Sequence, residues 1–392
     1  MTVITEFDST ELELTRRQAE SFQRSGFVDV RPATGGQWRM TASSHVGSLV
    51  VDGIEVLVRP KIDPENLFLL LEPGLPANAW RKEAFEYGVT SDLLPAVVAF
   101  FARTVETTLG RGILRAYLER SNSLIAMRGR LDLSAQFSRA GVMTPTVCTF
   151  DDFTEDIIEN RVLRAAIRLA LRVPRVRAAE RRRLMRQLAA LEGVADVPVG
   201  ASAVDSVHFT RLNDHYRPAL GLARLVLANL TMLDTPGPAS APSFMVDMND
   251  LFQRFVTERL RHALRGRLDV IDEPTVHLGE GRRVSMQPDL EFRHPGGAVS
   301  YVGDVKYKQA VGSRARSSDY YQLLAYTTAM DLPEGTLIYC RRQGDAGQQT
   351  VTVKNAGKRL VVHAIDFSAT AEQIETQIDE VADEIHRAAN RT

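Results

Sequence analysis

Residues 288–306 have the sequence PDLEFRHPGGAVSYVGDVK, and this stretch decides the fold that we expect for the C-terminal part of the chain. Its Pro-Asp pair ends one strand-like run, HPGG supplies a turn, and a second strand leads to the closing lysine. Residues two apart in a strand point to the same face, so Asp304 and Lys306 share a surface. The hairpin can bring Asp289 beside them. The sequence therefore predicts that two carboxylates and one ammonium converge at the strand ends.

This constellation suits the hydrolysis of a phosphodiester. The reaction requires a hard divalent cation that neutralises the phosphoryl group and lowers the pKa of a bound water. Carboxylate oxygens suit Mg²⁺, with Mn²⁺ as a substitute, and Lys306 can orient the attacking water or help to deprotonate it. An aspartate two residues before a lysine often arises by chance, and by itself it indicates only a surface ion pair.

Three further observations favour the nuclease interpretation. The Pro-Asp pair lies at a hairpin's distance upstream, and the helix-like segment Asp319–Tyr326 follows downstream. Lysine is scarce, with only six among the 48 basic residues. Because a guanidinium does not replace a compact ammonium, a lysine in this arginine-rich chain marks a place where an ammonium matters.

The chain is long enough for two or three domains, and we expect a multidomain α/β protein. Residues 1–150 are predicted to form a β-rich and helical domain, with a hairpin turn at Asp52-Gly53. Residues 151–234 are predicted to be helical, and 235–247, which begins TPGPASAPS, is the expected linker. Residues 248–392 then form an α/β unit whose mixed sheet is flanked by helices.

The helical region carries a row of arginines, at 161, 164, 168 and 172, that fall on one helix face. Such a row could contact the phosphates of a nucleic acid. The alternative, which we favour, is that the row is a solvated face or is paired with the acidic residues of a partner.

Composition excludes several other classes of protein. With 44% apolar residues and 25% charged residues, no stretch is apolar enough to span a membrane, and no secretion signal opens the chain, so we expect a cytoplasmic protein. Two cysteines and scattered histidines do not form a zinc site. The net charge of −1 requires any contact with DNA to come from a local patch. The P-loop pattern is absent, so any nucleotide hydrolysis must come from a partner.

At the level of whole segments, the C-terminal part resembles the PD-(D/E)xK nuclease superfamily, and the chain as a whole is similar to the McrC family. Beyond the residues above, the resemblance rests on three upstream segments, Val56–Ile62, Arg128–Leu133 and Phe150–Arg161. Gln322 and Tyr326 match a glutamine and a tyrosine that follow the catalytic lysine in related nucleases.

The resemblance implies a function and a set of partners. The C-terminal domain would be a Mg²⁺-dependent endonuclease core acting on double-stranded DNA. It would work with a hexameric, McrB-like AAA+ GTPase that recognises modified cytosine, in a type IV restriction system. The N-terminal part would bind that ring and stimulate its GTP hydrolysis. The implied catalytic residues are Asp289, Asp304, Lys306 and Gln322.

One position departs from the family pattern. Related nucleases often carry a Phe-Glu pair on the helix before the catalytic hairpin, whereas here Gln253 follows Phe252. We therefore consider Gln253 and Glu258 as further metal ligands beside Asp289 and Asp304. The missing charge also motivates an alternative, a structural activator of an AAA+ motor with a weak or degenerate nuclease. A stand-alone repair nuclease is a third possibility, and a neighbouring gene for a P-loop GTPase would argue against it.

Overall fold

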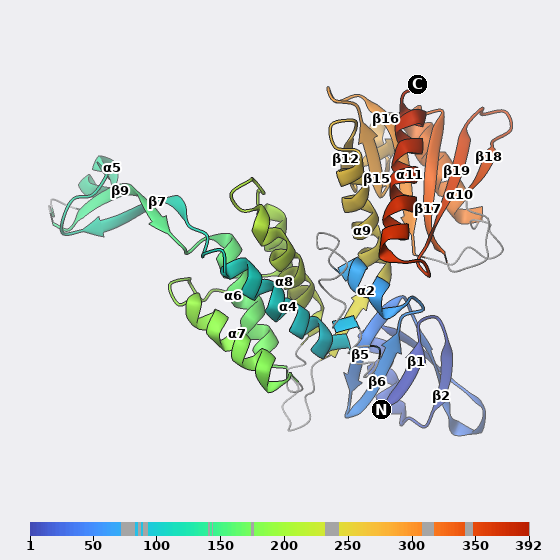
Figure 1. The fold of residues 1–392 in the computed structure, drawn as a ribbon, viewed down its shortest axis with the longest axis horizontal. Coiled ribbons are helices and arrows are strands. Elements are labelled where there is room, and N and C mark those ends of the chain that lie inside the picture. The colour runs from blue at the N-terminus through green and yellow to red at the C-terminus, as the bar shows by residue number, and fades with distance from the viewer. Residues whose placement is uncertain are drawn as a thin grey trace. The chain divides into compact units, whose positions relative to one another are not determined.

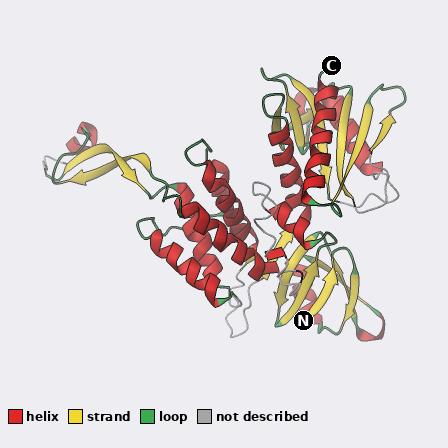
Figure 2. Cartoon of the chain, in the orientation of Figure 1, coloured by secondary structure: helices red, strands yellow, loops and turns green. Residues whose placement is uncertain are grey.

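The computed structural model describes residues 1–71, 83–84, 88, 93–139, 142, 144–173, 176–231, 243–307, 317–341 and 348–391. The chain divides into two compact units, Met1–Ala96 with Thr231–Thr392, and Val97–Leu230 (Figure 1). Strands predominate in the first unit and helices in the second (Figure 2). The domain boundary expected at residue 150 falls inside strand β9 (Thr146–Thr154), so residues 97–150 share a unit with the helical region.

The N-terminal part of the first unit contains two sheets. One has the order β1 (Thr2–Thr5), β6 (Ile54–Arg59), β5 (His45–Val51), β11 (Ser243–Asp247) and β10 (Leu230–Thr231). The other has the order β2 (Ser9–Leu12), β4 (Trp38–Ala42) and β3 (Val28–Pro32), with helix α1 (Arg16–Ser25) close by.

The hairpin predicted at Asp52-Gly53 is confirmed. Strands β5 and β6 pair antiparallel with Val51 opposite Ile54, which leaves two residues in the turn. Both turn residues have positive φ, 48° at Asp52 and 80° at Gly53. This is the backbone that tight hairpins require and that Asp-Gly adopts readily.

The two ends of the expected linker, residues 235–247, differ in what the structure describes. Residues 235–242 lie outside the described residues, whereas Ser243–Asp247 forms β11, which pairs antiparallel with β5. The segment after the Pro-rich stretch thus completes the N-terminal sheet. Helix α2 (Pro64–Leu71) makes a further connection, because Asn66 Nδ2 donates to the carbonyls of Phe367 at 2.7 Å and Ala369 at 3.0 Å. The N-terminal sheet and the C-terminal domain therefore belong to one compact unit.

The second unit is a group of helices with a long hairpin. Its helices are α4 (Leu93–Leu109), whose first residues belong to the other unit, α6 (Ile158–Leu171), α7 (Ala178–Ala190) and α8 (Arg217–Asn229). Leu163 and Leu220 are among their fully buried side chains. Strands β7 (Ala116–Leu124) and β9 form the hairpin, which extends away from the helices and bears β8 (Arg130–Leu131) and α5 (Leu133–Phe137) (Figure 1).

The C-terminal domain of the first unit is built on a six-stranded mixed sheet. The central strand β16 (Val299–Lys306) pairs antiparallel with β15 (Leu290–Arg293) and parallel with β17 (Glu334–Arg341). The full order is β12 (Asp269–Asp272), β15, β16, β17, β19 (Arg359–Asp366) and β18 (Gln348–Thr352). A short ribbon, β13 (Val276–Leu278) with β14 (Val284–Met286), lies between β12 and β15 in sequence.

Helices cover both faces of this sheet, as the sequence predicted. Val302 of β16 packs with Leu323 and Tyr326 of α10 (Ser317–Ala329). Tyr307 follows β16 and is an odd number of residues from Val302, so its side chain points to the other face. It meets Phe252 of α9 (Met248–Ala263) with ring centroids 5.9 Å apart. Because side chains alternate along a strand, α9 and α10 lie on opposite faces. Helix α11 (Ala371–Ala389) packs beside α9.

Candidate active site at the ends of three strands

The three residues singled out from the hairpin come together. Asp289 immediately precedes β15, and its Oδ2 accepts a hydrogen bond of 2.7 Å from the Val305 backbone N–H. Lys306 Nζ lies 2.6 Å from Asp304 Oδ2 and 3.8 Å from Asp289 Oδ2. Asp304 and Lys306 are an even number of residues from Val302 along β16. They therefore face the side of the sheet that α10 covers. The predicted convergence of two carboxylates and one ammonium is thus what the fold produces.

Burial sets the charges of this group. The Asp304 side chain is fully buried. Burial, and then the neighbouring Asp289 carboxylate, raise the pKa of Asp304 to about 7, although Lys306 acts in the opposite direction. Burial alone would lower the pKa of Lys306, but the two carboxylates outweigh it and raise that pKa. Lys306 is therefore the ammonium counter-charge of the pair in the metal-free protein.

The donor set fits a hydrated divalent cation. Asp304 Oδ1 is buried and accepts no hydrogen bond from the described residues. An acceptor in this state has an unmet need for a positive partner. No three His, Cys, Asp or Glu side chains among the described residues lie close enough to hold a metal ion by themselves. Mg²⁺ keeps several of its waters and is commonly bound through one or two carboxylates, so Asp289 and Asp304 meet its requirement.

Gln322 reaches this group through a tyrosine. Gln322 Nε2 donates to Tyr326 Oη at 2.6 Å, and the Tyr326 hydroxyl donates to the Gln287 carbonyl at 3.1 Å. Burial first, and then the charges of Asp304 and Asp289, raise the pKa of Tyr326, which places its hydroxyl within their electrostatic reach. The two residues carried over from related nucleases are therefore adjacent to the candidate site and bonded to each other.

The two further ligand candidates on α9 each contact another side chain. Glu258 forms an ion pair with Arg261 on its own helix. Gln253 Nε2 donates to Glu273 Oε1 at 3.1 Å, so its amide is used as a donor to a carboxylate. Sequence reasoning overlooked Glu273, which follows β12 directly. The signal for it was the Asp-Glu-Pro end of a strand that precedes the hairpin of Asp289 and Asp304.

The arginine row of α6 is paired within its own unit. Arg161 makes two hydrogen bonds to Asp156, of 2.7 and 2.8 Å, and Arg168 forms an ion pair with Asp196. Arg164 donates to the carbonyl of Leu191. These three arginines are thus paired within the chain itself, an outcome that neither interpretation from sequence had specified.

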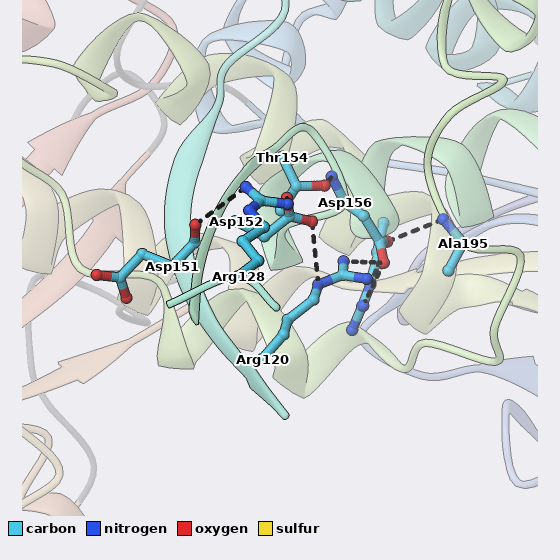
Figure 3. A network of polar contacts seen from close by, with 8 residues as sticks. Arg120, Arg128, Asp151, Asp152, Thr154, Asp156 and Ala195 are labelled. Atoms are coloured by element: carbon cyan, nitrogen blue, oxygen red, sulfur yellow. Dashed lines mark hydrogen bonds and ion pairs between the residues drawn. The ribbon is translucent and has the colours of Figure 1, made fainter. Parts of the chain in front are cut away.

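Asp156 is the centre of a wider network at the base of the hairpin (Figure 3). Arg120 Nη2 donates to Asp156 Oδ2 at 3.4 Å, and Ala195 N donates to Oδ1 at 2.9 Å. The hydrogen bond from Arg161 is the main cause that lowers the pKa of Asp156 to about 2. Arg128 joins the network through Asp152, at 3.3 Å. The segments 128–133 and 150–161, which carried part of the family resemblance, therefore supply residues of this network.

The described helices include none that is long and apolar enough to cross a membrane. Two features define the class of this protein, a mixed α/β fold and a buried carboxylate and lysine group at its strand ends. The sequence profile described as McrBC 5-methylcytosine restriction system component matches residues 40–340. Since this match covers most of the chain, the protein belongs to that family.

One solved structure shares the fold. The refined half-complex from the tetradecameric assembly of Thermococcus gammatolerans McrB AAA+ hexamers with bound McrC contains a chain that is 20% identical. The match covers 98% of this chain and 100% of that one, with a TM-score of 0.54. The cryo-EM structure of the Thermococcus gammatolerans McrBC complex matches 67% of this chain and 88% of its own, at 22% identity and a TM-score of 0.44. No curated protein sequence matches.

Proposed function

We propose that this chain is the DNA endonuclease subunit of a GTP-dependent, modified-cytosine-directed restriction system of type IV. Its C-terminal domain would be a PD-(D/E)xK core that hydrolyses phosphodiesters of double-stranded DNA with Mg²⁺, or Mn²⁺ in its place. The observation that carries the proposal is the fully buried Asp304, whose Oδ1 lacks a donor among the described residues. Although Asp304 Oδ2 is paired with Lys306, a buried acceptor without a donor has an unmet need for a positive partner, which a bound cation would supply.

Each residue of the group has a defined part in this proposal. Asp289 and Asp304 would hold the cation, which supplies charge neutralisation at the phosphoryl group and a more acidic bound water. The Val305 N–H fixes Asp289, since it donates to Oδ2. Lys306 Nζ holds a positive charge between the two carboxylates and can direct a hydrogen bond to the attacking water or the phosphate. Gln322 and Tyr326 would orient one side of the substrate.

The intact group also argues against the two alternatives considered from sequence. A degenerate nuclease has no reason to keep a buried carboxylate and its lysine in ion-pair contact at 2.6 Å. A stand-alone nuclease does not require the second unit, whose hairpin carries exposed large apolar side chains. Five of them lie between residues 125 and 142, namely Ile125, Met127, Leu133, Phe137 and Val142. Exposed apolar side chains of this number indicate a surface for a partner, for which we propose a McrB-like AAA+ GTPase hexamer.

The test separates the nuclease from the partner function within the full chain. Asp304→Asn keeps the size of the side chain but removes the cation's charge partner, so DNA cleavage should be abolished. Binding to the GTPase and stimulation of its GTP hydrolysis should persist, because we assign those contacts to the N-terminal part and the hairpin. The measurements are a pull-down, a GTPase assay and a plasmid cleavage assay on one preparation. Loss of GTPase stimulation in Asp304→Asn would refute this division of roles, and retained cleavage would refute the site.

A further inference from the structure

The register of the C-terminal sheet brings a third carboxylate to the strand ends. Asp272 of β12 lies opposite Leu290 of β15, and Leu290 lies opposite Gly303 of β16. One residue further along, the same row consists of Glu273, Asp289 and Asp304. A backbone hydrogen bond supports this extension, since Glu273 N donates to the Asp289 carbonyl at 3.1 Å. Residues that face each other across antiparallel strands have neighbouring side chains.

Glu273 is held in an unusual conformation. Its φ is +47°, in the left-handed region that a glutamate rarely adopts. Such a conformation is strained and persists only where the surroundings impose it. Gln287 imposes it in part, because its Nε2 donates to the Glu273 carbonyl at 3.2 Å and approaches Oε2 at 3.5 Å.

Gln253 holds the side chain itself. Its Nε2 donates to Glu273 Oε1 at 3.1 Å, across 20 residues of sequence. A glutamine at this helix position brings no charge, but its amide can fix a carboxylate that comes from elsewhere. The negative charge that Gln253 does not bring to α9 is thus carried by its hydrogen-bond partner Glu273, at the end of β12.

We propose that Glu273 is the third acidic residue of the cation site and that Gln253 and Gln287 position it there. The inference rests on the proposed nuclease function. Glu273 would accept hydrogen bonds from waters of the bound ion, because no three carboxylates lie close enough for direct ligation among the described residues. Outer groups of this kind orient the hydration shell and commonly change metal affinity by about 10- to 100-fold.

A Mn²⁺ titration followed by electron paramagnetic resonance tests this role in the full chain without DNA. Glu273→Gln should weaken Mn²⁺ binding by about 10-fold or more. The matched control is Asp269→Asn, which removes one carboxylate at the other end of β12, opposite Arg293, and should leave the affinity unchanged. A charge-swapped variant, Gln253→Glu with Glu273→Gln, should recover part of the lost affinity, because it returns one carboxylate to the same contact.

A third variant makes failure of this inference distinguishable from failure of the site. Asp304→Asn should abolish Mn²⁺ binding. If it does so while Glu273→Gln binds Mn²⁺ like wild type, the role of Glu273 is overturned and the nuclease site stands. If Asp304→Asn itself binds like wild type, the proposed site and the role of Glu273 fall together. Equal losses in Asp269→Asn and Glu273→Gln would show a general charge effect and would also overturn the inference. Thermal unfolding of each variant checks that the fold is kept.

Discussion

The arginine row of α6 and the acidic end of β16 are both dense in charge, but they satisfy that charge in opposite ways. In α6, Arg161 and Arg168 meet carboxylates of their own unit, at Asp156 and Asp196. In β16, Asp304 is more deeply buried than any of these, yet its Oδ1 accepts no hydrogen bond from the described residues. The arginines are satisfied by groups of their own unit, whereas Asp304, although paired with Lys306, keeps a buried acceptor without a donor among the described residues, and that acceptor is available to a ligand.

Among the single variants that test this comparison, Lys306→Arg should have the largest effect after Asp304→Asn. The guanidinium keeps the positive charge but is too broad for the place that the ammonium occupies between Asp289 and Asp304. We expect DNA cleavage to fall by about 100-fold or more, while the thermal unfolding midpoint changes little. The measurement is a cleavage time course with the GTPase partner present. A Lys306→Arg protein with near wild-type cleavage would reduce the lysine to a generic counter-charge and weaken the comparison.

Glu6 sharpens the comparison, because it is a buried carboxyl outside the candidate site. Its Oε1 accepts from the Lys61 N–H at 2.6 Å and from the Tyr307 hydroxyl at 2.7 Å, whereas Oε2 has no donor among the described residues. Burial is the main cause that raises the pKa of Glu6 to about 7, with Lys61 opposing it and Asp8 adding to it. Cys340 is also within electrostatic reach. A proton therefore relieves the burial of Glu6 below about pH 7, as the equally raised pKa indicates for Asp304 in the metal-free protein.

A raised pKa has a definite sign for stability. The contribution of Glu6 is fully present below its ordinary pKa of 4.5 and is lost as pH rises through about 7. The side chain of the Glu6→Gln variant cannot titrate. Between pH 5 and pH 8 the free energy of unfolding of this variant should therefore rise relative to that of wild type, by up to about 3 kcal/mol. Urea unfolding at several pH values measures the difference. A difference that does not change with pH would contradict the burial of a neutral carboxyl.

Asp156→Asn tests the satisfied side of the comparison. Because the folded-state pKa is lowered from 3.8 to about 2, the stabilisation is present above pH 3.8 and disappears as pH falls through about 2. We expect a loss of about 2 kcal/mol at pH 7 that shrinks towards pH 2. Asp151→Asn is the control, since its carboxylate points away from the arginines in Figure 3. Urea unfolding measures the loss of stability in each variant. Equal losses in Asp156→Asn and Asp151→Asn would show that the network has no special role.

The smallest effect should come from Arg168→Ala. The ion pair with Asp196 is about half exposed on both sides, and exposed pairs of this kind contribute about 0–1 kcal/mol. Because Arg168 is already paired, we also expect no change in the affinity for DNA or in its dependence on salt. Fluorescence anisotropy with a labelled duplex measures both. A weaker salt dependence in Arg168→Ala would show that the row contacts phosphates after all.

The parts that sequence predicted well are local. The Asp52-Gly53 turn and the shared face of Asp304 and Lys306 each depend on a few consecutive residues, for which hairpin chemistry and strand alternation are sufficient. The α/β unit was expected from the succession of strand-like and helical segments, and the mixed sheet flanked by helices from the family resemblance. The arginine row was left with two interpretations, because Asp196 lies 28 residues away from Arg168 and no spacing rule connects them.

The parts that sequence missed depend on pairing between distant strands. Ser243–Asp247 was expected to end a linker, but β11 pairs with β5 across about two hundred residues, a choice that only the tertiary fold makes. Glu273 was overlooked for the same reason. Its place beside Asp289 follows from the register of β12 against β15, which the sequence of β12 alone does not specify.

Calorimetric titration with Mg²⁺ tests most directly the claim that unmet carboxylates at the strand ends form a cation site. The full chain is compared with the double variant Asp289→Asn, Asp304→Asn, which preserves side-chain size and removes both charges. We predict that wild type binds Mg²⁺ and that the double variant does not, with Zn²⁺ unable to replace Mg²⁺ in supporting cleavage. Mg²⁺ binding of unchanged affinity and stoichiometry in the double variant would contradict the account.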